Sequence, residues 1–219
     1  MDWPVVWESR GILLHGFAVT LELSAIAIVG GGIVGLVVAV IRFARVPVVG
    51  PILRVYINIG RGTPLLMQLF FIFFGFPYFG INIDAFAAAV IALVAYTGAY
   101  VAEIVRSGLE SVHRGQRDAA LSLGLSFPQM MRRVVIPQAG IVALPPLVGL
   151  FIGVIKDTSL TTIIGYNELM NVSQSIVARA PNAIFTVYVV LAALYFIVCY
   201  PLSLLASRLE RRALVGQQR

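Results

Sequence analysis

The sequence is short of charge. Charged residues make up only 12% of its 219 positions and hydrophobic residues 59%, whereas an ordinary soluble domain has about 25% charged and about 45–50% apolar residues. So few charges cannot cover a surface in contact with water, and a chain this apolar does not stay disordered. The composition therefore argues against a water-soluble monomer and excludes disorder.

Cysteines and the signatures of common catalysts are also scarce or absent. The single cysteine, Cys199, permits no internal disulfide. The sequence has no G-x-x-x-x-G-K-[ST] phosphate loop and no nucleophile-elbow motif. His15 and His113 are isolated, so no metal-binding cluster is visible. We therefore expect neither an enzyme nor a metal site in this chain.

What the sequence does contain is five long apolar runs. A membrane-spanning helix needs about 20 mainly apolar residues, and the runs lie at 17–41, 52–76, 85–105, 139–155 and 184–205. The first run is too long for a cleaved signal peptide, and no basic cluster precedes it. The sequence predicts an all-α membrane protein, with five spans in a single domain over residues 1–219.

The sixteen basic residues are distributed unevenly between the loops. If the runs span a membrane, twelve basic residues fall on one side, three on the other and Arg61 inside the second run. The twelve are Arg42, Arg45, Arg54, Arg106, Arg114, Arg117, Arg132, Arg133, Arg208, Arg211, Arg212 and Arg219. Because cytoplasmic loops carry an excess of Lys and Arg, we expect the N-terminus outside and the C-terminus in the cytoplasm. The membrane explains the net charge of +6 better than nucleic-acid binding does.

Small residues recur at helical spacing in two of the runs. Gly31 and Gly35 are four residues apart in the first run, and so are Gly149 and Gly153 in the fourth. This spacing lets two helices approach closely. The alternative is that glycine is simply common in membrane helices.

Two adjacent prolines, Pro145 and Pro146, lie in the middle of the fourth run. A proline removes a backbone hydrogen bond, and in lipid such a break survives only against protein or a watery cavity. We expect the fourth span to be broken there and to line a cavity.

The longest segment on the arginine-rich side, residues 106–137, is not composed like a loop; we call it the elbow. Residues 115–123 predict a short helix with Asp118 in its first turn, where the helix dipole favours an anion. Gly124 follows as the expected C-terminal cap.

A second helix is expected just after this cap. Ser126 with Gln129 three residues later predicts a capping box, and Pro137 is expected to bend or end the helix. Two short helices would thus be joined by a stiff turn.

The turn has little side-chain bulk. Ala119, Ala120 and Gly124 are small, so another protein could approach the backbone closely. The alternative is that the elbow packs on the helices of its own chain.

The elbow resembles the "EAA" loop of permease subunits of bacterial ABC importers, whose pattern is E-A-A, three residues, G, nine residues, I-x-L-P. The matching residues here are Asp118, Ala119, Ala120, Gly124, Val134, Ile136 and Pro137. The spacing is the same. The departures are Asp for Glu, Val for Ile and Ile for Leu, and all three are chemically mild.

Further motifs are similar to those of the polar amino acid branch of that family. They are Tyr56-Ile57-Asn58, Arg61-Gly62-Thr63-Pro64-Leu65-Leu66, Gln68, Glu103-Ile104-Val105-Arg106-Ser107-Gly108, Gly115-Gln116, Pro137-Gln138-Ala139 and Lys156-Asp157-Thr158-Ser159-Leu160. Together they cover residues 56–160, which makes the resemblance specific.

The resemblance implies a type I importer permease in the bacterial cytoplasmic (inner) membrane. Two permease subunits, identical or sister chains, would form the pathway. Two copies of a separate ATPase would bind the elbows through Asp118, Ala119, Ala120, Gly124 and Pro137. An external binding protein would deliver the amino acid. ATP and magnesium would bind the ATPase, so this chain would hold no cofactor.

Charged residues within the spans are costly and call for a partner. Arg61 in the second span is expected to pair with Glu103 near the inner end of the third. Arg106, three residues further along the same helix, is a rival partner for Glu103. Direct contact of Arg61 with the substrate is the alternative.

Other polar residues are candidates for the substrate pathway. Thr63 and Gln68 flank Pro64, which disturbs the second span and can free a backbone carbonyl. Glu22 lies in the first turns of span one, where it could instead reach interfacial water.

The segment from Lys156 to Ser159 is the richest polar cluster near the outer face. Lys156 and Asp157 could complement the two charges of a free amino acid, with Asp157 contacting the ammonium group and Thr158 and Ser159 adding hydrogen bonds. Alternatively, Lys156 and Asp157 neutralise each other at the helix end. Residues 161–180 are too polar to span lipid and predict a surface or re-entrant helix.

A different class of transporter remains open from sequence alone, namely an ion-coupled secondary carrier or a channel. Five spans offer no inverted repeat of the usual kind, which weighs against a carrier. A membrane scaffold without transport is a third class. The sequence does not identify the amino acid carried.

Overall fold

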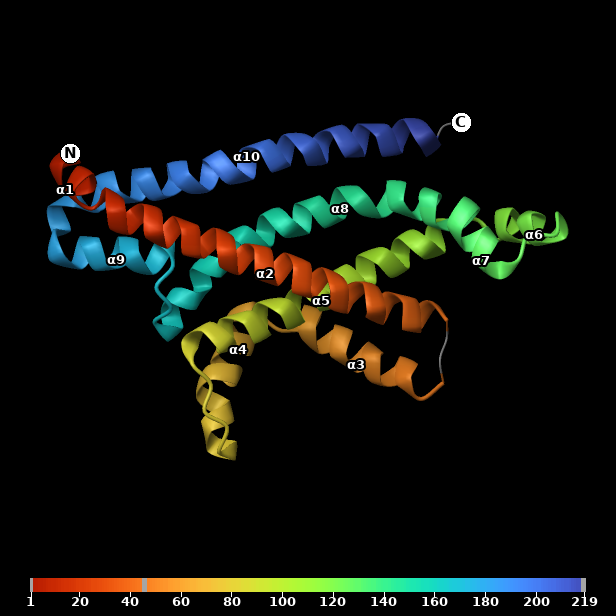
Figure 1. The fold of residues 1–219 in the computed structure, drawn as a ribbon, viewed down its shortest axis with the longest axis horizontal. Coiled ribbons are helices and arrows are strands. Elements are labelled where there is room, and N and C mark those ends of the chain that lie inside the picture. Colours follow the sequence, from red (N-terminus) through yellow and green to blue (C-terminus); the bar gives the residue numbers. More distant parts are fainter. Residues whose placement is uncertain (1, 45–46, 218–219) are drawn as a thin grey trace.

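In the computed structural model, residues 2–44 and 47–217 are described, and the folded elements within these ranges are helical (Figure 1). The α-helices are α1 (Trp3–Glu8), α2 (Arg10–Phe43), α3 (Val49–Gly62), α4 (Leu65–Phe70), α5 (Ala85–Ser111), α6 (Arg114–Ser122), α7 (Phe127–Met130), α8 (Ile136–Asp157), α9 (Leu169–Arg179) and α10 (Ile184–Gln217). Short 3-10 or π-helical turns are η1 (Phe71–Gly75), η2 (Phe76–Phe79), η3 (Met131–Val135), η4 (Thr158–Ile164) and η5 (Pro181–Ala183).

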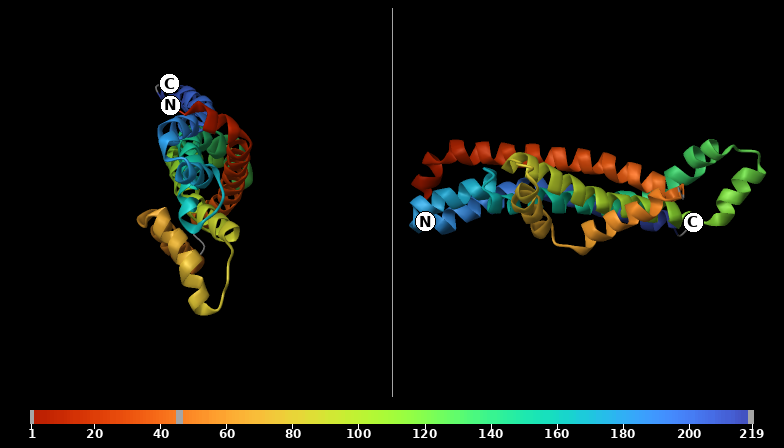
Figure 2. Two further views of the ribbon diagram at one scale, coloured as in Figure 1. Left: turned by 90° about the vertical axis from the view of Figure 1, so that its left-hand side faces the viewer. Right: turned by 90° about the horizontal axis from the view of Figure 1, so that it is seen from below.

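Four long helices, α2, α5, α8 and α10, run roughly side by side along the long axis of the molecule (Figures 1 and 2). Helices α6 and α7 project at one end of this bundle, the end where α10 also finishes. Helices α1 and α9 lie at the opposite end. The elbow and the C-terminal end of α10 therefore lie at the same end of the bundle, as expected when two long helices, α8 and α10, separate them.

Four of the five expected spans are single helices of sufficient length and apolarity to cross a membrane, namely α2, α5, the helix that includes α8, and α10. Each extends beyond the range expected from the sequence, because helices continue past the lipid into the polar layers. Arg45 and Arg219, which contributed to the charge asymmetry, lie outside the described residues.

The second expected span, 52–76, is not one straight helix. It breaks at Thr63, whose backbone is extended, and the two halves are bent by 110°. The cause is Pro64, which disfavours helical geometry in the residue before it. The second half, α4 to η2, consequently projects sideways from the bundle (Figures 1 and 2).

Two other proline predictions are wrong in part: Pro146 does line a cavity, but neither the break predicted there nor a helix end at Pro137 is found. Pro145 and Pro146 lie inside an uninterrupted α8, so the fourth span is not broken there. A proline keeps a helical φ, and neighbouring protein can compensate for the lost hydrogen bond. Pro137 does not end its helix either. The helix passes through the π-helical segment η3 just before Pro137, and Pro137 lies in the first turn of α8.

The glycine pair of the first span packs against α5. A Cβ built on Gly31 would lie 2.5 Å from Cβ of Thr97, and one on Gly35 would lie 2.5 Å from Cβ of Val101. These glycines therefore set the closest approach of α2 and α5. In contrast, a Cβ on Gly149 or Gly153 would meet nothing within 4 Å, so that pair makes no such contact in the described chain.

Gly35→Ala is expected to lower stability, because the new methyl group would also lie 2.7 Å from the carbonyl oxygen of Gly98. Overpacking of this kind costs about 1–3 kcal/mol. Thermal unfolding of the detergent-purified protein should show a lower midpoint. Gly32→Ala is the matched control, because it lies on the same helix with open space around it. Equal midpoints for the two variants would contradict the close approach.

Candidate functional site

The tip of the elbow is a tightly capped turn. Gly124 has φ = +81°, a left-handed conformation that side chains with a Cβ rarely adopt. The N–H of Leu125 donates to the carbonyl of Ala120 at 3.2 Å, and that of Gly124 donates to Leu121 at 2.9 Å. This pair of hydrogen bonds is a Schellman motif, which closes α6 at the point where the sequence places its cap.

Both helices of the elbow also have defined starts. Helix α6 begins at Arg114, earlier than expected, so Asp118 lies in its second turn rather than its first. The helix dipole is therefore weaker at Asp118 than expected. On the other side of the turn, Oε1 of Gln129 accepts a hydrogen bond from the Ser126 N–H at 2.9 Å, as part of the expected capping box.

One face of the elbow packs on the bundle. Ala120 and Met130 are buried in a cluster with Leu109 and Val112. The guanidinium of Arg117 donates to the Leu109 carbonyl at 2.6 Å. The side chain of Ala120 is thus turned inward and is not available to another protein.

The other face of the elbow is open. Leu121, Leu123 and Phe127 are 46%, 84% and 60% exposed, and Asp118, Ala119, Gly124 and Pro137 are exposed as well. Apolar side chains exposed on a rigid turn are characteristic of an interaction surface. Packing on the bundle is therefore found on one face of the elbow, whereas docking of a partner on the exposed face stays a prediction.

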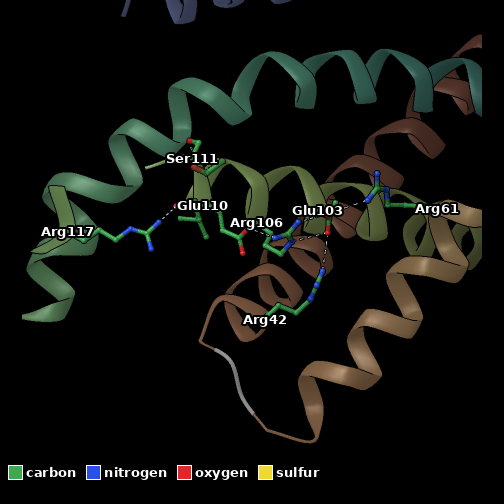
Figure 3. A network of polar contacts seen from close by, with 9 residues as sticks. Arg42, Arg61, Glu103, Arg106, Glu110, Ser111 and Arg117 are labelled. Carbon is green, nitrogen blue, oxygen red and sulfur yellow. Dashed lines mark hydrogen bonds and ion pairs between the residues drawn. The ribbon is translucent and has the colours of Figure 1, made fainter. Parts of the chain in front are cut away.

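A second polar site lies where α2, α3 and α5 meet (Figure 3). Oε2 of Glu103 is 3.1 Å from Nη1 of Arg42, and Oε1 is 3.7 Å from Nη1 of Arg61. Both oxygens also bond to the guanidinium of Arg106, which in turn holds Glu110. Three guanidinium groups therefore share two carboxylates, leaving a net positive charge.

Within this network, Arg61 is held least closely. The structure does bring Arg61 to Glu103, but Arg106 and Arg42 approach the carboxylate more closely. Arg61 is 44% exposed, and its Cζ lies 5.6 Å from the centre of the Tyr100 ring. Arg42 had been interpreted only as a loop charge, since the sequence does not reveal that the last turn of α2 faces Glu103.

The polar residues at the break in the second span satisfy one another. Nε2 of Gln68 donates to the carbonyls of Gly60 and Thr63 at 3.0 and 3.2 Å, and to the Thr63 hydroxyl at 3.0 Å. The hydroxyl of Thr63 donates to the Ile59 carbonyl. Gln68 thus accommodates the backbone that Pro64 leaves without helical partners.

The residues from Lys156 to Ser159 do not converge on one point. The hydroxyl of Thr158 is buried and donates to the Ile155 carbonyl, and that of Ser159 donates to the Lys156 carbonyl, both at 2.7 Å. Lys156 is exposed beside a pocket of about 510 Å³ formed largely by α10, whereas Asp157 is half-buried. Glu22 is exposed on α2.

The sequence reasoning missed Glu168, which is fully buried at the start of α9. Its carboxylate accepts hydrogen bonds from the N–H groups of Asn171 and Met170 at 2.8 and 2.9 Å, and from the hydroxyls of Thr20 and Tyr195 at 3.3 and 3.4 Å. Burial raises the pKa of Glu168, and these donors oppose the shift. Its place before an apolar helical pattern was the available signal, but glutamate is not a usual N-cap residue.

The described residues offer no metal site. In the ranges 2–44 and 47–217, no three His, Cys, Asp or Glu side chains come together in a way that could hold an ion. His113 instead caps α6 through Nδ1, which accepts from the Gly115 N–H at 3.3 Å.

The fold and the elbow define a polytopic helical transport subunit, and comparison with known proteins agrees. Residues 31–215 match the family described as "Binding-protein-dependent transport system inner membrane component". The chain belongs to this family, among the permeases of amino acid ABC importers. Its fold is that of a type I importer permease.

Two curated relatives cover nearly the whole chain. The L-cystine transport system permease protein TcyB of Bacillus subtilis is 40% identical over 97% of this chain and 91% of its own length. The glutamine transport system permease protein GlnP of Escherichia coli (strain K12) is 38% identical, over 96% and 97% respectively.

Solved structures also match. A crystal structure of an amino acid ABC transporter with histidines superposes with a TM-score of 0.87 at 36% identity, covering 97% of this chain and 99% of the other. The MetNI methionine ABC transporter, at 21% identity and a TM-score of 0.73, shares the fold.

Glu103→Gln is expected to destabilise the protein by about 1–3 kcal/mol, because it leaves partly buried guanidinium groups without their shared carboxylate. Thermal unfolding in detergent should show this as a lower midpoint. Glu110→Gln is the control, since Glu110 is more exposed and contacts only Arg106 in this network. Equal effects of the two variants would show that Glu103 does not hold the helices together.

Exchanging the charges of Arg61 and Glu103 is not expected to rescue stability. The arginine introduced in place of Glu103 would be repelled by Arg42 and Arg106, which both lie next to that position. Full rescue by Arg61→Glu combined with Glu103→Arg, measured in the same assay, would mean that Arg61 is the principal partner after all.

Proposed function

We propose that this chain is the membrane-spanning subunit of an ATP-driven importer that carries a polar amino acid across the bacterial cytoplasmic membrane. The observation that carries the proposal is the open face of the elbow, formed by Leu121, Leu123 and Phe127 around the capped turn at Gly124. A separate ATPase binds this face, and the chain itself carries out no ATP chemistry.

The elbow is built to transmit movement. Its first helix follows α5 directly, and its second helix continues through η3 into α8, with no interruption from Phe127 to Asp157. The caps at Gly124 and Ser126 stiffen the turn between them. When ATP and magnesium close the two ATPase copies, a displacement of the elbow therefore moves α5 and α8 instead of being absorbed by a flexible loop.

The remaining partners follow from the same assignment. A second permease, either another copy or a sister chain, completes the pathway, and an external binding protein delivers the amino acid. The N-terminus lies outside and the C-terminus in the cytoplasm, since the elbow and the C-terminal end of α10 share the arginine-rich end of the bundle.

Asp157 is the residue of this chain that recognises the ammonium group or a basic side chain of the substrate. It is half-buried at the end of α8, and no lysine or arginine within the described ranges forms an ion pair with it at 4.0 Å or less. The relatives are named for L-cystine and glutamine transport, which supports an amino acid as the cargo. Glu22, Thr63, Gln68, Thr158 and Ser159 frame the pathway.

Gly124→Val is expected to uncouple ATP hydrolysis from transport while leaving membrane insertion intact, because a β-branched residue strains the left-handed turn. The measurements are co-purification of the ATPase and ATP-driven uptake in proteoliposomes. Gly165→Val is the matched control, because Gly165 has a similar φ of +75° and open space but lies outside the elbow.

Normal ATPase binding and normal uptake by Gly124→Val would reject the docking role of the elbow. Uptake driven by an ion gradient with no ATPase present would instead favour a secondary carrier. Transport by neither route would favour a scaffold.

Asp157→Asn is expected to reduce uptake and to alter the order of preference among acidic, amide and basic amino acids, because it removes the negative charge facing the substrate. Uptake competition in proteoliposomes measures both effects. Lys156→Gln is the control, since Lys156 lies beside the α10 pocket. Unchanged uptake and preference in Asp157→Asn would remove Asp157 from the substrate site.

A further inference from the structure

A cavity of about 350 Å³ lies between α3, α5 and α8, next to the charge network. The residues that matter for its chemistry are Arg61, Tyr100, Glu103, Ser107, Gly108 and Pro146. Its lining residues on α5 and α8 lie in the second half of α5 and the first half of α8, which are the halves next to the elbow. It is therefore distinct from the outer end of α8, where Asp157 lies.

Arg61 is the cation that this cavity presents. Arg42 and Arg106 are nearer to Glu103, whereas the 3.7 Å separation between Arg61 and Glu103 is too long for a hydrogen bond. The Arg61 side chain is also 44% exposed. Its planar set of N–H groups matches the two oxygens of a carboxylate, which neither a lysine nor a neutral side chain can do as well.

The surroundings favour an anionic ligand. Three guanidiniums against two carboxylates leave one positive charge in excess. Within a membrane such a charge belongs in a watery cavity or beside a partner. Arg61 is twelve residues beyond the start of α3, or about 18 Å along the helix. If α3 begins at the surface of a hydrocarbon layer about 30 Å thick, this length carries Arg61 away from the phospholipid headgroups.

We propose that this cavity is a second binding site for the transported amino acid, in the inner half of the pathway, where Arg61 binds the α-carboxylate. The inference rests on the proposed function. Pro146 and Asp157 are eleven residues apart on α8, or about 16 Å. One amino acid therefore cannot occupy both places, and the cargo is held first at Asp157 and later at Arg61.

Two tyrosines on α5 form an aromatic surface next to this second binding site. The rings of Tyr96 and Tyr100 are 4.7 Å apart, and Arg61 lies over the Tyr100 ring. Tyr96 lies one turn further from the elbow than Tyr100 on α5, and α5 packs along α8, whose last residue is Asp157. The two tyrosines thus extend the aromatic surface from the cavity at Arg61 toward the end of α8 that carries Asp157.

The test uses the permease with its ATPase and the external binding protein in proteoliposomes loaded with product. The imported amino acid is first identified from uptake of glutamine, cystine, arginine and histidine. Inhibition of ATP-driven uptake is then measured with the same amino acid inside, and separately with its carboxamide, which lacks the carboxylate charge. The free acid is expected to inhibit the wild type at a concentration about tenfold or more below that of the carboxamide, as expected for one charge-assisted contact.

Arg61→Gln is expected to abolish this preference, and Arg61→Lys to retain part of it. Arg42→Gln is the matched control, because Arg42 contacts Glu103 at 3.1 Å but does not line the cavity; it should keep the preference. Equal loss in Arg42→Gln would mean that Arg61 acts only through the ion network, and the subsite would be rejected.

Two further outcomes overturn the inference. The first is that Arg61→Gln keeps the preference for the free acid over the carboxamide. The second is that a saturating concentration of the amino acid inside the vesicles does not inhibit uptake by the wild type. Absence of ATP-driven uptake by the wild type for every amino acid offered would reject the proposed function itself, and this result is distinct from a failure of the subsite alone.

Discussion

The structure depends on the requirement that polar groups inside a membrane find partners within the protein, because hydrocarbon offers none. Where Pro64 breaks the second span, one side chain, Gln68, donates to the exposed carbonyls. Where Glu103 enters the bundle, arginines from three helices converge on it. At these two places, the departure from a simple apolar helix is matched by nearby groups that compensate for it.

The polar groups of these clusters fall into two kinds, those that already have partners within the protein and those that do not. Arg42 and Arg106 are occupied by Glu103, whereas Arg61 retains exposed N–H groups. Thr158 and Ser159 use their hydroxyls on the end of their own helix, whereas Asp157 forms no ion pair among the described residues. Within each polar cluster, the group that is not already satisfied is the one left for a ligand.

The sequence predicted what depends on local pattern. Runs of apolar residues located α2, α5, α8 and α10, and the order Gly124, Ser126, Gln129 located the elbow and its caps, because these signals act over a few residues. It could not predict that Thr63 would turn the chain by 110° while Pro145 and Pro146 leave a helix intact. Proline sets a local constraint, and the surrounding packing decides the outcome. Arg42 and Glu168 were missed because their partners are distant in sequence.

The helix is continuous from Phe127 through η3 into α8. The direction in which its first turns face is therefore fixed relative to the direction in which α8 faces. An α-helix turns by about 100° for each residue, and the π-helical segment η3 turns by a different angle. The exposed side of the elbow helix and the side of α8 that lines the cavity at Pro146 are thus held in a fixed relative orientation by the number of residues between them. Substitutions along the helix leave this relative orientation unchanged, whereas the insertion or deletion of a single residue would rotate one face relative to the other.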